Sequence, residues 1–219
     1  MSTPTRRAAL RVLLHVDFRA FLIARLLATL AAQMQTVAVG WQIYAITRDP
    51  LDLGLIGLSQ FLPFIVLILP AGQLADHYDR RRILMLCYVT EAFCALALLA
   101  FTIGELTVAW PVFAAMTLLG CARAFSMPSG QALLPNLVPA EDFTRAVALN
   151  SSVFQIATVV GPALGGVLYL AGPRVVYATV LAFAALAALL MLRVRKGARS
   201  ATTAREPASW ETLLSGLRF

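Results

Sequence analysis

Three charged side chains stand inside otherwise uncharged, apolar stretches of this sequence. They are Arg25, Glu91 and Arg123, and Glu91 is the only carboxylate within any of these stretches. A charge in hydrocarbon costs about 2.5–3.5 kcal/mol on insertion scales, so such residues face a protein interior or water and find partners. We predict a polar cluster that takes part in proton movement or in closing a gate. The alternative is structural: Arg25 extends to the lipid headgroups, and Glu91 neutralises one arginine.

A second group of chemically active residues lies in the connection after the second apolar stretch. It combines small residues, an acid and an arginine cluster. Its sequence is Gly72-Gln73-Leu74-Ala75-Asp76-His77-Tyr78-Asp79-Arg80-Arg81-Arg82. An acid is favoured near a helix N-terminus by the helix dipole, and arginines can pair with acids when a gate closes. An ordinary basic loop at the membrane surface accounts equally well for the arginines alone.

A motif of glycine and proline lies in the middle of the fifth apolar stretch. Its sequence is Gly161-Pro162-Ala163-Leu164-Gly165-Gly166. Proline opens the hydrogen-bond ladder of a helix, and glycines let a neighbouring backbone approach closely. The motif therefore indicates either a functional helix contact or a generic packing surface.

Long apolar helices must carry all of these residues, because the chain is too hydrophobic for a water-soluble domain. Of its 219 residues, 60% are hydrophobic and only 13% are charged, with a mean hydropathy of +0.79. A soluble domain carries about 25% charged residues, and a membrane-spanning helix needs about 20 apolar ones. The sequence predicts an all-α membrane protein with a bundle of six transmembrane helices. The helices are expected over 20–46, 52–75, 82–104, 107–133, 145–171 and 174–192.

Lysine and arginine gather on one side of the predicted spans. Of the 18, 14 lie before the first span, in the second and fourth connections, or after the last span. Arg48 and Arg174 lie on the opposite side. Because short cytoplasmic loops carry the excess of positive charge, this asymmetry predicts that both termini are cytoplasmic. It also accounts for the net charge of +7 without a nucleic-acid partner.

Other chemistries lack the residues that they need. Cys87, Cys94 and Cys121 lie in apolar stretches without ligand spacing, which indicates small buried residues and neither a disulfide nor a metal site. His15 and His77 lie at predicted helix ends, and the sequence has no GxSxG, HExxH or nucleotide-binding motif. We therefore expect no enzyme activity, no metal and no cofactor.

The connection after the second span resembles the signature of the major facilitator superfamily between helices 2 and 3. The matching residues are Gly72, Leu74, Ala75, Asp76, Arg80 and Arg81, while Asp79 stands where the family often has glycine. The resemblance implies the N-terminal half of a two-half transporter, built as a 3+3 inverted repeat. It also implies that Gly72 allows close helix approach and that Asp76 meets a helix N-terminus of the other half at a gate.

Two further likenesses narrow the expectation. Gly161, Pro162, Gly165 and Gly166 resemble the helix-5 motif of proton-coupled drug exporters in this superfamily, although alanines replace its upstream glycines. The sequence around Arg123 is similar to the branch that contains the enterobactin exporter and macrolide efflux pumps. Both likenesses imply export.

In the resembled fold, helices 1, 2, 4 and 5 of each half line a central cavity. Polar or small residues at steps of three and four follow one face of the first helix and one face of the fifth. The resemblance makes four of them candidates for lining the cavity: Gln33, Thr36, Ser151 and Gln155. Hydrogen bonding between packed helices, worth about 0.6 kcal/mol per pair, explains the same stripes.

These patterns predict three segments. They are a cytoplasmic arm over 1–19, the six-helix bundle over 20–192, and a basic linker with the start of a second half over 193–219. We expect a secondary transporter in a bacterial inner membrane that exports a small molecule, such as a drug or siderophore, by proton-coupled alternating access. Its expected partners are the lipid bilayer, protons, the substrate and a second six-helix half. An uptake transporter of the same fold and a non-transporting fragment or partner subunit stay open as alternatives.

Overall fold

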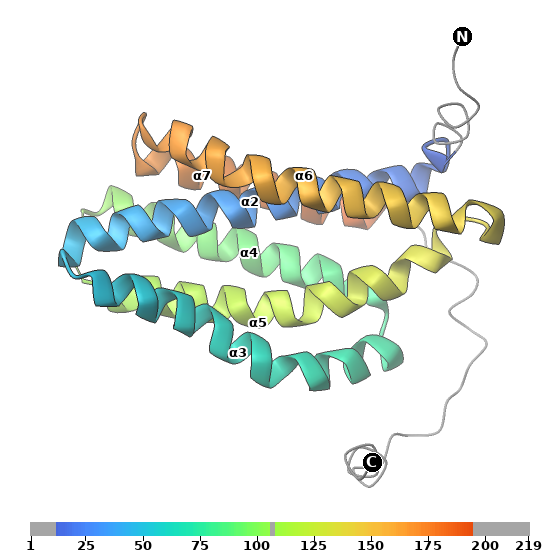
Figure 1. The fold of residues 1–219 in the computed structure, drawn as a ribbon, viewed down its shortest axis with the longest axis horizontal. Coiled ribbons are helices and arrows are strands. Elements are labelled where there is room, and N and C mark those ends of the chain that lie inside the picture. Colours follow the sequence, from blue (N-terminus) through green and yellow to red (C-terminus); the bar gives the residue numbers. More distant parts are fainter. Residues whose placement is uncertain (1–11, 106–107, 195–219) are drawn as a thin grey trace, which may run out of the picture.

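The computed structural model describes residues 12–105 and 108–194. These residues form six long helices and two short 3-10 turns, without a strand in the described ranges (Figure 1). The helices are α2 (Val16–Thr47), α3 (Pro50–His77), α4 (Arg80–Ile103), α5 (Trp110–Leu133), α6 (Phe143–Tyr169) and α7 (Pro173–Arg193). The turns η1 (Leu134–Asn136) and η2 (Ala140–Asp142) lie between α5 and α6.

All six predicted spans are confirmed as helices that are long and apolar enough to cross a bilayer. Their ends differ from the predicted ones by a few residues. α2 begins at Val16, ahead of the apolar stretch, because Asp17 and Arg19 extend the helix without breaking it. α5 begins at Trp110, and a proline in its first turn suits a helix start because the missing N–H has no helical partner there.

Turn residues explain where several helices begin and end. Arg48 ends α2 in the left-handed conformation, with φ of 56°, and the side chain of Asp49 then accepts the backbone N–H two residues ahead at 2.9 Å to start α3. Asp79 caps α4 in the same way at 3.1 Å. Gly172 adopts φ of 107° between α6 and α7, a conformation that favours glycine. These tight connections make consecutive helices antiparallel.

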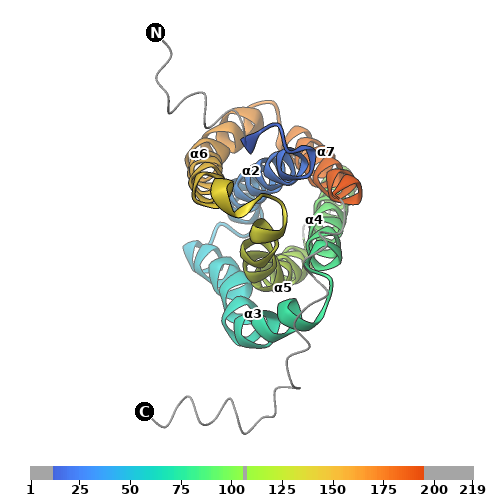
Figure 2. The ribbon, with the colours of Figure 1, turned by 90° about the vertical axis from the view of Figure 1, so that its right-hand side faces the viewer.

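The helix packing repeats once within the bundle, as expected for two inverted three-helix units. α3 packs against α5 as α6 packs against α2, and α4 packs against α5 as α7 packs against α2. α4 and α7 pack against each other. Since α2 and α5 are separated by an odd number of antiparallel connections, the second unit is inverted. The end view places α4 and α7 on one side of the bundle and α3 and α6 on the other (Figure 2).

Two apolar clusters hold the two ends of the bundle. One includes Val12, Phe18 and Val194, so both ends of the described chain lie at the same end of the bundle. The other surrounds Tyr177, whose hydroxyl donates to Oε1 of buried Gln42 at 2.5 Å. The amide of Gln42 donates in turn to the hydroxyl of Thr102 on α4 at 2.9 Å, so one polar chain links α7, α2 and α4.

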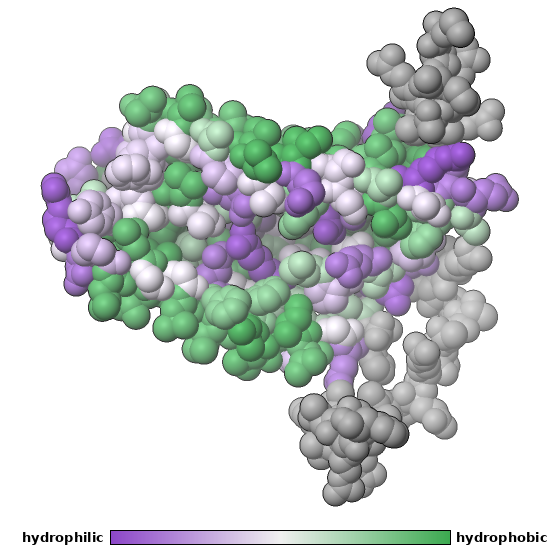
Figure 3. All heavy atoms as spheres, viewed as in Figure 1, coloured by the Kyte–Doolittle hydropathy of each residue, from purple (hydrophilic) through white to green (hydrophobic). Residues whose placement is uncertain are grey.

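α3 and α6 contribute less to the interior than the other helices. Of their most apolar 18 residues, 6% and 17% are buried, against 39–50% in the other four helices. The space-filling view shows hydrophobic surface along both helices, with a hydrophilic band between them (Figure 3). The two helices therefore form apolar rims around a more polar centre.

Candidate functional site

A cavity of about 340 Å³ lies between these rims. Residues of α2, α3, α4, α5 and α6 line it, and the hydrophilic band of Figure 3 marks its position between α6 and α3. All three charged residues predicted to cluster, Arg25, Glu91 and Arg123, lie in its wall. The helices α2, α4 and α5 thus bring every charge of the predicted cluster to one cavity.

Arg123 is held by a polar chain that crosses the cavity wall. Its Nη2 donates to Oε1 of Gln33 at 3.2 Å, and the amide of Gln33 donates to the backbone carbonyl of Thr158 at 3.4 Å. The chain connects α5, α2 and α6. Gln33, a predicted cavity residue, is therefore the link that orients one of the two arginines.

Arg25 is held by shape more than by hydrogen bonds. Its guanidinium carbon lies 5.7 Å from the ring centroid of Phe154 on α6, within the range of a cation–π contact. On the α5 side it lies against Gly130, where a methyl group would collide with Nη1. Its Nε is buried and has no hydrogen-bond partner among the described residues.

Glu91 is the most enclosed of the three charged residues, with 5% of its surface exposed. Its Oε1 is buried without a hydrogen-bond partner in the described part of the chain. No described carboxylate lies within 4.0 Å of the guanidinium of Arg25 or Arg123. The structure therefore gathers the three groups around one cavity without closing them into a direct ion pair.

Thr36, Ser151 and Gln155, the other candidates for lining the central cavity, are not in the wall of this cavity. The hydroxyl of Thr36 donates to the carbonyl of Ala32 in its own helix at 2.8 Å. Ser151 and Gln155 are exposed on α6 and do not line the cavity. The face of α6 that meets the cavity carries Phe154 and Thr158 instead.

Sequence reasoning missed several residues of the cavity wall. Gln60 is a polar residue inside the apolar stretch that became α3, and its position gave a signal of the same kind as Gln33. Tyr88 lies one helical turn before Glu91 and therefore shares its face. Phe61 and Phe64 gave no signal, because phenylalanine is equally common on surfaces that face lipid.

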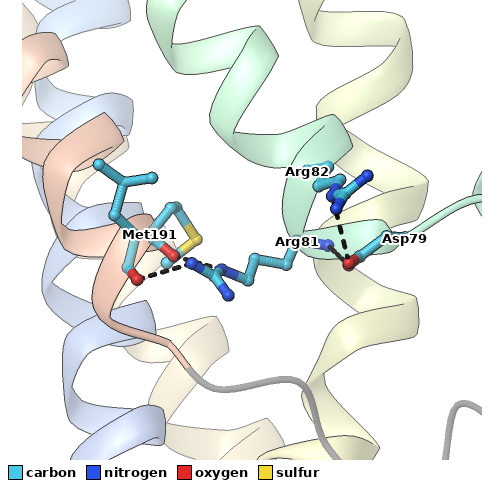
Figure 4. A network of polar contacts seen from close by, with 5 residues as sticks. Asp79, Arg81, Arg82 and Met191 are labelled. Atoms are coloured by element: carbon cyan, nitrogen blue, oxygen red, sulfur yellow. Dashed lines mark hydrogen bonds and ion pairs between the residues drawn. The ribbon is translucent and has the colours of Figure 1, made fainter.

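The arginine cluster between α3 and α4 reaches backbone carbonyls at helix ends (Figure 4). Arg81 donates through Nε to the carbonyl of Met191 at 2.7 Å and through Nη2 to that of Leu192 at 2.6 Å. Arg80 donates to the carbonyls of Ala132, at the end of α5, and Ala75. Positive charge is favoured at a helix C-terminus, where carbonyls lack helical partners. The loop thus ties the ends of α5 and α7 to the start of α4.

The remaining residues of the loop motif lie at the end of α3 and at the start of α4. Gly72 lies in α3, and a methyl group on it would meet nothing within 4 Å. The backbone of Asp76 belongs to the last turn of α3, but its side chain lies outside the described part of the structure. Asp79, which replaces the usual glycine of the family, caps α4 and also lies 3.8 Å from Nε of Arg82.

Two glycines of the helix-5 motif let α6 approach α2. A Cβ on Gly161 would lie 2.6 Å from Cβ of Gln33, and one on Gly165 would lie 2.9 Å from Cα of Met34. Gly166 faces open space. Pro162 is half-buried inside the helix. The close contact therefore depends on the pair spaced by four residues.

Curated relatives share this sequence over part of their length. The Enterobactin exporter EntS of Salmonella choleraesuis is 30% identical over 163 residues, which cover 72% of this chain and 38% of that protein. The Staphyloferrin A transporter of Staphylococcus aureus is 29% identical over 135 residues, covering 60% and 34%. Macrolide efflux protein A of Streptococcus pyogenes is 31% identical over 125 residues, covering 56% and 30%. The chain thus spans about a third of the length of these relatives.

The family comparison covers almost the whole chain. Residues 8–219 match the protein family described as transmembrane secretion effector. The family and the relatives are transporters and not enzymes, in agreement with the absence of catalytic motifs from the sequence. With its six apolar helices and its inverted repeat, the chain is a multi-pass membrane protein that belongs to the major facilitator superfamily, in the family of transmembrane secretion effectors.

Proposed function

We propose that this chain is the N-terminal six-helix half of a proton-coupled exporter of small molecules. The observation that carries the proposal is the cavity between α3 and α6, which gathers Arg25, Glu91 and Arg123 inside a bundle of membrane-spanning helices. Ionisable residues are expensive within a membrane and mark substrate or proton pathways. The relatives named as exporters of enterobactin and of macrolides support a drug or siderophore as the substrate.

Glu91 is the group that carries the proton in this mechanism. Among the described residues it is the only carboxyl group in the cavity wall, and two arginines line the same cavity. Gain or loss of a proton there changes the charge balance of the site. Alternating access then exposes the group to one side of the membrane at a time. The loop residues Gly72, Asp76, Arg80 and Arg81 form the gate, and the Gly161–Gly166 motif holds the helix that moves with the cavity.

The proposal includes a second six-helix half. The apolar surface that α3 and α6 present around the cavity supports it, and so does the fact that the chain spans about a third of the length of its relatives. The space beside Gly72 suits a helix of that half. The same bundle would serve an uptake transporter or a partner subunit, and the experiment below separates these outcomes.

Orientation and location follow the charge pattern. The bundle sits in a bacterial inner membrane with residues 1–19 and 193–219 on the cytoplasmic side. The described arginines at the end with Val12 and Val194 include Arg19 and Arg193, while Arg48 and Arg174 lie at the other end. This distribution agrees with the positive-inside rule.

Export from an efflux-deficient bacterial strain tests the proposal. The chain is expressed there together with its second six-helix half, and export of erythromycin and of enterobactin is followed with and without a protonophore that collapses the proton gradient. We expect gradient-dependent export of one of the two. The Glu91→Gln variant should lower it to the level of the strain without the chain, because the glutamine cannot take up or release a proton.

The control variant is Glu105→Gln, which removes a carboxylate at the exposed connection between α4 and α5 and should export like the wild type. Gradient-dependent export by Glu91→Gln at the wild-type rate would contradict the role of Glu91. Gradient-dependent accumulation would indicate uptake. Absence of transport, together with crosslinking only to another six-helix chain, would identify a partner subunit.

A further inference from the structure

We infer that the cavity selects amphipathic anions, in which a carboxylate or a similarly acidic oxygen group is joined to an aromatic or otherwise apolar body. The inference names the substrate class of the site and rests on the proposed function for its role in transport. It depends on three features of the wall: its charge, the free edge of one arginine, and its aromatic lining.

The charge of the wall is unbalanced. Among the described residues that line the cavity, Arg25 and Arg123 are cationic and Glu91 is the single carboxyl group. A guanidinium stays protonated under physiological conditions, so the wall holds at least one positive charge without a protein carboxylate to match it. Because a charge away from bulk water is costly when it is unpaired, such a wall favours a ligand that brings a negative group.

Arg25 is the arginine that a ligand can engage, because its Nε is enclosed by the protein while its terminal nitrogens make no hydrogen bond to a described residue. Arg123 already donates to Gln33, whereas Nε of Arg25 has no hydrogen-bond partner among the described residues. The planar guanidinium of Arg25 is held over the ring of Phe154. A guanidinium fixed in one plane can bind both oxygens of a carboxylate in a two-point contact, which a neutral amide reproduces poorly.

The remainder of the wall fits an apolar body. Phe61 and Phe64 from α3, Tyr88 from α4, Met127 from α5 and Phe154 from α6 surround the space. Aromatic walls favour flat apolar groups through stacked and edge-on contacts. The volume of about 340 Å³ lies at the small end of the range for ligand sites. An inorganic anion would leave this apolar surface unused.

Three probes with one naphthalene ring and different charges test the inference. They are 1-naphthoate, which is anionic, 1-naphthamide, which is neutral, and 1-naphthylmethylammonium, which is cationic. Equilibrium dialysis measures their binding to the purified chain in nanodiscs of zwitterionic lipid, with empty nanodiscs to correct for partition into lipid. We expect the naphthoate to bind at least about tenfold more tightly than the amide, and the ammonium most weakly.

Variants assign the preference to the cavity. Arg25→Gln keeps a polar side chain but removes the charge, and it should bring the naphthoate and the amide to similar affinity. Arg174→Gln removes an exposed arginine at the end of the bundle, outside the cavity, and should keep the wild-type preference. Equal binding of the three probes by the wild type, or a preference for the ammonium, overturns the inference. So does a naphthoate preference that survives in both Arg25→Gln and Arg123→Gln.

The charge series on the wild type needs no variant to fold, so it decides the inference by itself. It also measures binding without transport, and this separates it from the test of the proposed function. Export without any charge preference overturns the inference alone. An anion preference in a chain that supports no transport even together with its second half overturns the proposed function alone.

Discussion

At the residue scale, the position of Arg25 depends on a glycine in the facing helix α5, because a larger residue there would occupy the space of the guanidinium. Gly130 on α5 lies directly against Nη1 of Arg25, while Phe154 on α6 covers the guanidinium at 5.7 Å. The cation is therefore fitted between two helices by the shapes of its neighbours. A methyl group added at Gly130 would therefore displace the side chain of Arg25 and not the backbone of a neighbouring helix.

We predict that Gly130→Ala moves the guanidinium of Arg25 and weakens the preference for an anion. The new methyl group would meet the far end of a flexible side chain, so the side chain shifts and the packing of α5 changes little. The ratio of naphthoate to naphthamide affinity should fall toward one, with little change in the melting temperature of the purified chain. Gly166→Ala, whose methyl group would meet nothing within 4 Å, should leave the ratio unchanged. An unchanged ratio in Gly130→Ala would mean that Arg25 does not bind the anion.

The charged residues and one amide residue of the cavity could be predicted from the sequence. Arg25, Glu91, Arg123 and Gln33 stand out because membrane burial of such groups is costly, and all four line the cavity. The same reasoning placed Ser151 on a cavity stripe, although this residue is exposed on α6. Hydropathy gives the polar face of a helix but not the rotation of that face relative to its neighbours. The aromatic residues of the wall gave no signal at all, because lipid and an apolar ligand favour the same side chains.

At the element scale, the contact between α2 and α6 is set by two glycines one helical turn apart. Gly161 and Gly165 face Gln33 and Met34 across the contact, and Gly166 beside them faces open space. Gly165 and Gly166 are therefore a matched pair of positions in one helix. An alanine at Gly165 would collide with Met34, and an alanine at Gly166 would meet nothing within 4 Å.

Gly165→Ala is expected to destabilise the bundle, because its Cβ would lie 2.9 Å from the backbone Cα of Met34 and the two helices must separate. Overpacking of this kind costs about 1–3 kcal/mol. Gly166→Ala gains the helix propensity of alanine without the collision, so the difference between the two variants isolates the contact. Thermal unfolding in detergent, followed by size-exclusion chromatography, measures both. Equal melting temperatures would show that α2 and α6 do not approach closely in the membrane.

The helices were the most predictable elements of the fold. Six apolar stretches of spanning length leave no alternative to helices in a bilayer, where each backbone polar group must find a partner within its own segment. The ends were less predictable, because charged residues such as Asp17 continue a helix beyond its apolar part. The choice of neighbours, with α3 on α5 and α6 on α2, was not predicted, because hydropathy alone does not pair helices.

At the scale of the whole molecule, the bundle has two chemically different ends. The described arginines outside the cavity gather at the end that holds Val12 and Val194, apart from Arg48 and Arg174. By the positive-inside rule, this separation of charge predicts that the end with Val12 and Val194 faces the cytoplasm. It also makes the orientation testable with one residue from each end.

Cysteine labelling in intact cells tests the orientation. In a chain whose three native cysteines are replaced by alanine, Arg174→Cys should react with a maleimide that cannot cross the membrane. Arg145→Cys should react only after the inner membrane is permeabilised. Both arginines are exposed and both form an ion pair with a nearby acid, so the two positions are well matched. The opposite pattern would place both termini outside the cytoplasm.

The contacts of Arg81 also have a mechanical consequence. This side chain begins at the start of α4 and holds the last carbonyls of α7 through two short hydrogen bonds, at the point where the chain leaves the bundle. The guanidinium thus joins the end of α7 to the first turn of α4. We therefore expect a pull on the chain at the end of α7 to act on the first turn of α4, where the proposed gate residues Arg80 and Arg81 lie.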